Sequence, residues 1–182
     1  RGCSGRYVLS KGVMSAQENP PQSSRGKNVA MQKTILVVDD DVSIRKTLCA
    51  ILEEEGYNVD TAENGAQAIE KSNAKFYNLA LIDIRLPDME GTELLKAIKD
   101  TTPKMIKIIV TGYPSLENAI EALNKGADGY MIKPVEISEL LTTVKEHLQK
   151  QEEAGRYSER KFADFIETRA REMEQSETKP HT

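Results

Sequence analysis

The chain has 182 residues, of which 38% are hydrophobic and 30% are charged, and it carries a formal net charge of −4. This length suits one domain of ordinary size with additional chain to spare. The mild negative charge argues against a general nucleic-acid-binding protein, which would be basic, so we expect no direct binding to nucleic acid.

Two cysteines, Cys3 and Cys49, are too few for a disulfide framework. We therefore expect free thiols in a reducing compartment and a cytoplasmic protein. No apolar run approaches the ~18 residues of a membrane span, and residues 1–32 lack the apolar core of a signal peptide. We expect no insertion into a membrane.

Residues 1–32 are rich in glycine, serine and proline and have almost no apolar periodicity. Such a segment buries too little apolar surface to offset its ordering entropy, so we predict that it is disordered. Because the chain begins at Arg1, either Met14 or Met31 could be the natural start of the protein.

From Lys33 the pattern changes to short apolar runs, each followed by a segment whose apolar residues recur at helical spacing. Gly56 and Gly126 are expected to end the first and fourth of these helices. Repeated strand–helix pairs with short loops predict an α/β domain over residues 33–149, with a doubly wound parallel sheet covered on both faces. The expected strands are residues 34–38, 57–61, 79–82, 106–110 and 129–132.

Polar residues follow four of these strands. The first strand ends in Asp39 and Asp40, the third in Asp83, the fourth in Thr111 and the fifth in Lys133. Ligands of parallel α/β sheets bind outside the carboxyl ends of the strands, so we expect these side chains to converge. Clustered acids favour a hard divalent cation such as Mg²⁺, and a lysine and a hydroxyl can bind phosphate oxygens. Asp83 would then be the nucleophile that forms an aspartyl phosphate.

Each of these residues has a common structural explanation when it is taken alone. An aspartate pair before a helix is more often an N-cap, a threonine after a strand is an ordinary turn residue, and a lone lysine is ordinary surface. The specific feature is that all of them lie at strand ends of one sheet.

The segment from residue 33 to residue 149 resembles a response regulator receiver domain of the stand-alone, chemotaxis type. The resemblance implies a flavodoxin-like sheet with strand order 2-1-3-4-5. It rests on four stretches of sequence: Ile35–Asp40, Leu81–Gly91, Val110–Gly112 and Gly126–Pro134.

The resemblance implies that Asp83 accepts phosphate from a sensor histidine kinase, a phosphotransfer protein or a small phosphodonor. Asp39 and Asp40 would hold Mg²⁺ together with Asp83 and the main-chain carbonyl of Arg85. The chain would catalyse only its own phosphoryl transfer and dephosphorylation, and would otherwise be no enzyme. It would serve a two-component phosphorelay.

The resemblance also implies a switch. Thr111 would move toward the phosphate, Tyr130 would turn inward behind it, Lys133 would pair with the phosphoryl group, and the Lys133–Pro134 bond would be cis. A downstream protein would bind the face of the fourth helix and fifth strand, which includes Tyr130 and the apolar residues of 116–123. For Tyr130, a plain buried or rim aromatic is the alternative.

Two further side chains near the site are individual to this sequence. Arg85 lies two residues past Asp83, and Tyr113 lies two residues past Thr111. Our hypothesis is that both limit the access of water and so set the lifetime of the phosphate.

Residues 150–182 form a charged, partly helical C-terminal tail in which Gly155 is expected to interrupt the helix. Apolar residues recur at helical spacing from Phe162 to Met173. This pattern fits either a solvated helix or a helix that docks on a partner or on a second copy of the chain.

Two other functions would use a similar set of residues or the same fold. A phosphatase of the haloacid dehalogenase type also uses Asp, Thr or Ser, Lys and Mg²⁺, and Asp39 and Asp41 approximate its first motif. However, no acidic pair follows Lys133, the chain has no cap insertion, and Asp83 would be left without a role. The other alternative is a receiver-like module that works without phosphate, but no residue of the set is missing.

Overall fold

The computed structural model describes residues 32–99 and 101–177. The segment predicted to be disordered lies outside the described residues except for Gln32, whose side chain donates to the carbonyl of Gly56. Cys3 also lies outside them, whereas Cys49 is a free thiol on the first helix.

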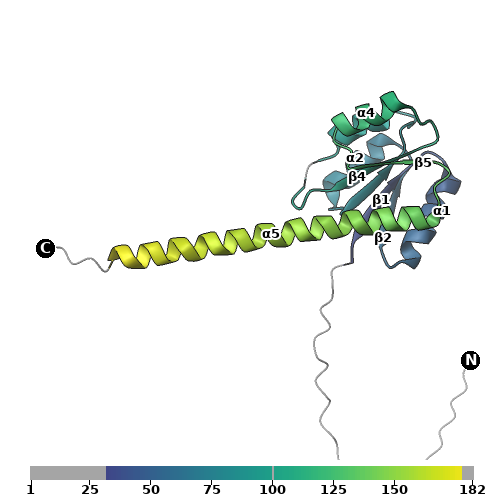
Figure 1. Ribbon diagram of the computed structural model, residues 1–182. Coiled ribbons are helices and arrows are strands. Elements are labelled where there is room, and N and C mark those ends of the chain that lie inside the picture. Colours follow the sequence, from purple (N-terminus) through teal and green to yellow (C-terminus); the bar gives the residue numbers. More distant parts are fainter. Residues whose placement is uncertain (1–31, 100, 178–182) are drawn as a thin grey trace, which may run out of the picture. The chain divides into compact units, whose positions relative to one another are not determined.

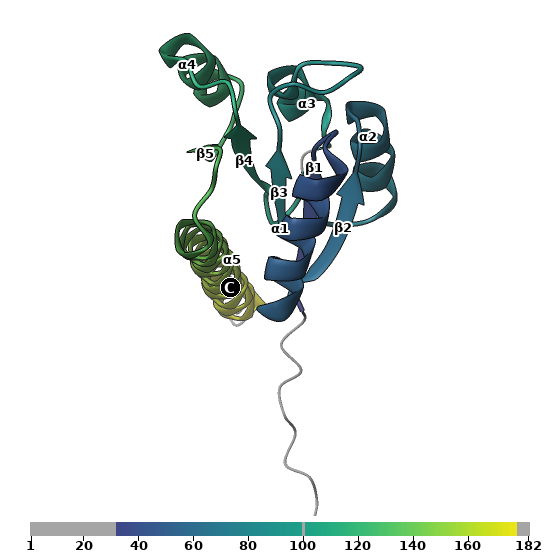
Figure 2. The ribbon, with the colours of Figure 1, turned by 90° about the vertical axis from the view of Figure 1, so that its right-hand side faces the viewer.

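Five parallel strands form one sheet in the order β2-β1-β3-β4-β5 (Figures 1 and 2). This confirms the expected fold and strand order. β2 is one residue later than predicted, and β4 extends to include Thr111. The strands are β1 (Thr34–Val38), β2 (Asn58–Ala62), β3 (Leu79–Ile82), β4 (Ile106–Thr111) and β5 (Gly129–Ile132).

Helices cover both faces of the sheet, as predicted. α1 and α5 pack on one face, where Leu52 and Val144 join a buried aliphatic cluster. α2, α3 and α4 lie on the other face, where Ala68 and Leu94 join a second cluster. The helices are α1 (Val42–Glu54), α2 (Gly65–Ala74), α3 (Gly91–Ala97), α4 (Leu116–Asn124) and α5 (Ile137–Glu177).

Local sequence explains where several helices begin and end. The side chains of Asp41, Asn64 and Ser115 accept backbone N–H groups at the starts of α1, α2 and α4, which satisfies donors that the helix leaves unpaired. Gly56 and Gly126 follow α1 and α4 with φ of 87° and 96°. Their left-handed conformation confirms both as helix-ending glycines.

α4 is attached to the sheet by small side chains. Ala122 is its one buried residue, whereas Leu116, Ile120 and Leu123 are 77%, 50% and 58% exposed. The apolar spacing predicted this helix correctly, but its large apolar side chains face outward instead of covering the sheet. The fourth helix therefore presents an apolar surface, which is where a downstream target is expected to bind.

α5 runs without interruption through Gly155, so the break expected there is wrong. An interior glycine costs a helix only about 1 kcal/mol relative to alanine, and good helix formers surround this one. The predicted boundary after residue 149 falls inside α5, and the division into a domain and a charged tail stays a prediction. Within residues 32–99 and 101–177, no helix combines the length and apolar character that a membrane span requires.

The last part of α5 carries a stripe of exposed apolar side chains. Phe162 and Ile166 follow Val144 and Leu148 by about five turns, so they continue the side of the helix that packs on the sheet. Beyond the sheet this side is uncovered. The stripe comprises Phe162, Phe165, Ile166 and Met173, each at least 50% exposed.

Gln151 anchors α5 to the sheet two residues beyond the predicted domain boundary. Its Nε2 donates to the carbonyl oxygens of Asn78 (3.0 Å) and Lys104 (2.6 Å), and its Oε1 accepts from Nδ2 of Asn78 (3.2 Å). Asn78 Oδ1 in turn accepts the backbone N–H of Thr34 at the start of β1. This buried network satisfies backbone groups at the amino ends of three strands.

We predict that Gln151→Ala lowers the free energy of unfolding by about 1–3 kcal/mol, because the Lys104 carbonyl loses this donor and Nδ2 of Asn78 loses its acceptor. Gln149→Ala is the matched control, since Gln149 is exposed and bonds only to Glu153 on its own helix among the contacts described. Urea denaturation of both variants tests this. Equal stabilities would show that α5 is not anchored by Gln151.

Candidate functional site

The carboxyl ends of four neighbouring strands bring the predicted residues together. Asp39 follows β1, Asp83 follows β3, Thr111 is the last residue of β4, and Lys133 follows β5. These strands are adjacent in that order, so their ends line one edge of the sheet. The edge includes the point where the strand order reverses, which is where such sheets bind ligands.

Three carboxylates form an acidic cluster at this edge. One oxygen from each of Asp39, Asp40 and Asp83 lies within 4.8 Å of the others. Asp39 and Asp83 are only 2% and 8% exposed, whereas Asp40 is exposed. Carboxylates this close repel one another, so the cluster is stabilised by a positive charge or by a proton.

Lys133 supplies a positive charge inside the site. Its Nζ lies 2.6 Å from Oδ2 of Asp39 and 3.3 Å from Oδ2 of Asp83, and its side chain is 16% exposed. Removing one partner from such a buried group leaves an uncompensated charge. The Lys133–Pro134 peptide is cis, which confirms that expectation.

The surroundings of Asp83 raise the pKa of its carboxyl group. Burial raises its pKa, the ammonium of Lys133 opposes this shift, and the charge of Asp39 adds to it. Its Oδ1 accepts the backbone N–H of Ile84 at 2.8 Å, while Oδ2 is the oxygen that lies near Lys133. The ionised form of Asp83 is therefore less favoured than that of a free aspartate, and a nearby positive charge stabilises it.

Asp41 has a different role from the two aspartates before it. Its Oδ1 accepts the N–H groups of Ser43 (2.7 Å) and Ile44 (3.2 Å) as the N-cap of α1. Its own N–H donates to Oδ1 of Asp39 at 2.9 Å. The capping function thus falls to Asp41, and the acid that a haloacid dehalogenase motif would need is used elsewhere.

The donor set fits a hard divalent cation. It consists of carboxylate oxygens with no nitrogen or sulfur ligand, and oxygen ligands are those that Mg²⁺ prefers. The main chain of Arg85 lies two residues beyond Asp83 and pairs with Glu90 in an isolated antiparallel bridge. The part played by the Arg85 carbonyl stays a prediction.

The two expected switch residues occupy enclosed positions. Thr111 is fully buried, and its hydroxyl oxygen accepts the N–H of Tyr113 at 3.0 Å. The hydroxyl of Tyr130 is also buried and makes no regular hydrogen bond with the described residues. Burial raises the pKa of Tyr130, and the backbone of Ser115 opposes that shift. The Tyr130 ring is therefore turned inward, with its hydroxyl near the backbone of Ser115.

Arg85 and Tyr113 form a stacked pair beside the site. The guanidinium carbon of Arg85 lies 3.6 Å from the centre of the Tyr113 ring, within the range of a cation–π interaction. Both side chains are exposed. The sequence predicted each residue separately, and the structure adds the contact between the loops after β3 and β4.

Sequence reasoning missed two residues that hold the loop after β3. Asp88 accepts the N–H groups of Gly65 and Ala66 at the start of α2, each at 2.8 Å, and these bonds lower its pKa. Gly91 approaches so closely that a Cβ there would clash with the main-chain carbonyl oxygen of Asp83. The available signals were an aspartate and a glycine within the Leu81–Gly91 stretch of the sequence.

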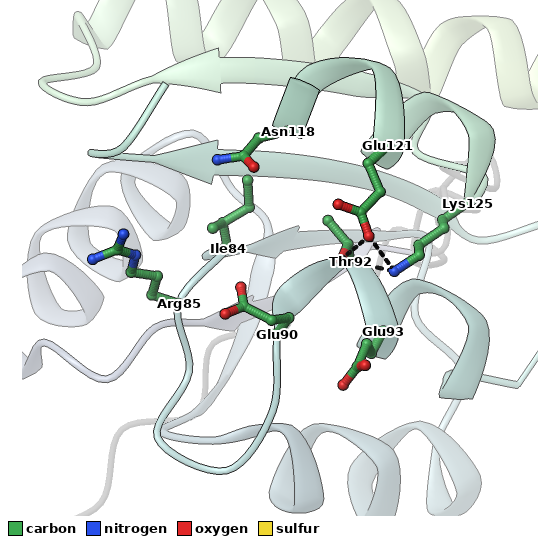
Figure 3. Close-up of a pocket in the computed structure, with 8 residues that line it drawn as sticks. All are labelled: Ile84, Arg85, Glu90, Thr92, Glu93, Asn118, Glu121 and Lys125. Carbon is green, nitrogen blue, oxygen red and sulfur yellow. Dashed lines mark hydrogen bonds and ion pairs between the residues drawn. The ribbon is translucent and has the colours of Figure 1, made fainter. Parts of the chain in front are cut away.

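A polar pocket of about 200 Å³ lies beside this loop, between α3 and α4 (Figure 3). On its wall Lys125 contacts Glu121 (2.5 Å) and the hydroxyl of Thr92 (3.1 Å). Figure 3 shows these three side chains pointing toward one another, while Glu90 comes from the loop. The cluster links α4 to the residue that follows Gly91.

Comparison with known proteins agrees with this geometry. The family model described as the response regulator receiver domain matches residues 35–145. The transcriptional regulatory protein ZraR of Klebsiella oxytoca is 46% identical over 117 residues. The match covers 64% of this chain but only 26% of ZraR, so the chain spans about a quarter of that relative's length.

Two solved structures are similar over nearly their whole length. The CheY-like receiver domain protein of Methanospirillum hungatei is 51% identical with a TM-score of 0.65, covering 68% of this chain and 99% of that one. The response regulator TrrA of Thermotoga maritima, solved in complex with Mg²⁺-BeF, is 37% identical with a TM-score of 0.58, covering 64% and 99%.

Gly91→Ala should lower the free energy of unfolding by about 1–3 kcal/mol, because the new methyl group overpacks against the Asp83 backbone. Gly112→Ala is the matched control, since nothing lies within 4 Å of a Cβ at that position. Its effect should be within about 0.5 kcal/mol. Thermal and urea unfolding provide the measurement, and equal losses in both variants would contradict the close approach.

Proposed function

The chain belongs to the response regulator receiver family, and we propose that it is the phospho-accepting switch of a two-component signalling system. In this proposal Asp83 carries the phosphate. The observation that supports it most is the ammonium of Lys133, which lies near both Asp39 and Asp83 in a cluster of three carboxylates.

The proposed reaction is a phosphoryl transfer to Asp83. A carboxylate oxygen of Asp83 forms a bond to phosphorus, and the bond from phosphorus to the donor breaks, leaving its electron pair on the donor. Lys133 and Thr111 donate hydrogen bonds to the phosphoryl oxygens. A Mg²⁺ ion held by Asp39, Asp40, Asp83 and the Arg85 carbonyl would supply charge neutralisation at those oxygens.

Hydrolysis resets the switch. Water attacks phosphorus, inorganic phosphate leaves, and the carboxylate of Asp83 is restored. We propose that the chain catalyses these two steps on itself and no reaction of another substrate. We propose that the stacked pair of Arg85 and Tyr113 limits the approach of water.

Phosphorylation adds a charge of about −1.5 to −2 beside Thr111 and Lys133 and draws their donors toward it. A move of Thr111 affects Tyr113, whose N–H it accepts, and so reaches the start of α4. The exposed apolar side of α4 and the strand that carries Tyr130 then form the surface that a downstream protein reads.

The proposed partners are a histidine kinase or phosphotransfer protein, which donates the phosphate, and a downstream effector. ZraR is named a transcriptional regulatory protein, but this chain spans only a fraction of it. We propose that the chain acts in the cytoplasm without binding nucleic acid directly. A docking partner or second copy would bind through the exposed stripe of α5.

Incubation with acetyl phosphate and Mg²⁺ tests the proposal by intact-mass spectrometry. We predict one added phosphoryl group on the unmodified chain and none on Asp83→Asn or in the presence of EDTA. Asp164→Asn, at an exposed aspartate on α5, should retain the adduct. Turnover of a phosphate ester without an adduct would favour a phosphatase, and no adduct at all would favour a phosphate-independent module.

The Arg85–Tyr113 pair makes a separate kinetic prediction. Loss of an exposed cation–π contact of about 0.5–1 kcal/mol should speed dephosphorylation roughly two- to fivefold in Arg85→Ala or Tyr113→Ala. The double variant should be no faster than either single variant, since either change removes the whole contact. Tyr113→Phe keeps the ring and should match the unmodified chain. Unchanged rates in both alanine variants would contradict the role.

A further inference from the structure

Asp39 is hydrogen-bonded at every polar atom it has. Its N–H donates to the carbonyl of Ala62 (3.1 Å), Oδ1 accepts the N–H of Asp41 (2.9 Å), and Oδ2 accepts Nζ of Lys133 (2.6 Å). The remaining atom, its main-chain carbonyl oxygen, accepts Nη1 of Arg45 at 2.5 Å. Only this last bond comes from a side chain that has no place in the proposed chemistry.

Arg45 reaches that carbonyl from the first turns of α1. Its side chain is 13% exposed, and its Nη2 lies 3.9 Å from Oε2 of Glu63 in the loop after β2. The guanidinium therefore joins α1, the end of β1 and the β2–α2 loop. A forked, always charged donor suits such a position better than a lysine does.

The carbonyl that Arg45 binds belongs to the peptide unit between Asp39 and Asp40. Since a peptide unit is planar, orienting its carbonyl also orients the bonds to the Cα atoms of both residues. One hydrogen bond thus restricts the positions from which two carboxylates of the acidic cluster project.

We infer that Arg45 is a positioning residue for the cation site, acting through the Asp39–Asp40 peptide and not through its charge. The inference rests on the proposed function in so far as the cluster binds Mg²⁺. Partners one shell outside metal ligands typically contribute about 10–100-fold to metal affinity by orienting those ligands.

The sign of the effect separates positioning from charge. Removing a positive charge near a cation site lowers the repulsion felt by the cation, so a charge effect alone would make Mg²⁺ bind more tightly. Loss of positioning makes Mg²⁺ bind more weakly. Lys46 is the matched control, because it carries the same charge on the next residue of α1 and is exposed.

The test compares Arg45→Met and Lys46→Met in the full chain. Calorimetric titration with MgCl₂ gives the Kd for Mg²⁺, and thermal unfolding in EDTA gives the Tm without metal. We expect the Kd of Arg45→Met to rise about 10-fold, while that of Lys46→Met stays unchanged or falls. A Kd of Arg45→Met equal to or below that of Lys46→Met would overturn the inference.

Arg45→Lys covers the case in which the methionine variant does not fold. It keeps the charge but replaces the planar fork with a single ammonium, so positioning predicts weaker Mg²⁺ binding than in the unmodified chain. A Kd equal to that of the unmodified chain would count against the inference, as would an unmodified chain that binds no Mg²⁺.

The phosphorylation assay keeps the two proposals apart. If the unmodified chain takes up phosphate but Arg45→Met and Arg45→Lys bind Mg²⁺ normally, only the inference about Arg45 fails. If the Kd shifts as expected but Asp83 takes up no phosphate, the proposed function fails and the positioning role remains.

Discussion

The ammonium of Lys133 lies close to two buried carboxylates that the parallel sheet forces together. Adjacent β1 and β3 end in Asp39 and Asp83, so the acids cannot separate without breaking the strand pairing between them. Their repulsion is relieved in part by one lysine from the end of β5. The exposed third acid, Asp40, adds negative charge that Lys133 alone leaves unbalanced, and this excess suits the site to a cation.

The loops around this cluster are held mostly through main-chain groups. Asp41 caps α1, Asp88 binds the start of α2, and Gly91 packs directly on the backbone of Asp83. Within residues 32–99 and 101–177, Lys133 is the one side chain seen to donate to the carboxylate of Asp40 or Asp83. Carboxylate oxygens that are held in place but still free to accept can bind a ligand with little rearrangement of the loops.

Much of this arrangement could be predicted from the sequence because strand ends in a parallel sheet meet at one edge. The periodicity located all five strands within one residue, and the strand ends identified the clustered residues. The apolar spacing did not predict that Leu116, Ile120 and Leu123 face outward. Spacing shows that a helix has an apolar side, but it does not show which side packs on the sheet. Arg85 and Tyr113 were chosen separately, since a stacking contact between two loops depends on loop conformation. The break predicted at Gly155 is wrong because one interior glycine costs a helix only about 1 kcal/mol, which the surrounding helix formers offset.

The central claim is that one carboxylate of the cluster, that of Asp83, becomes covalently modified. Borohydride reduces an acyl phosphate to an alcohol, so treatment after exposure to acetyl phosphate and Mg²⁺ converts the modified aspartate to homoserine. Peptide mapping by tandem mass spectrometry then identifies the residue. Our account predicts homoserine at position 83 and unmodified aspartate at Asp39, Asp40 and Asp88. Homoserine at any of those three positions, or at none, would contradict it.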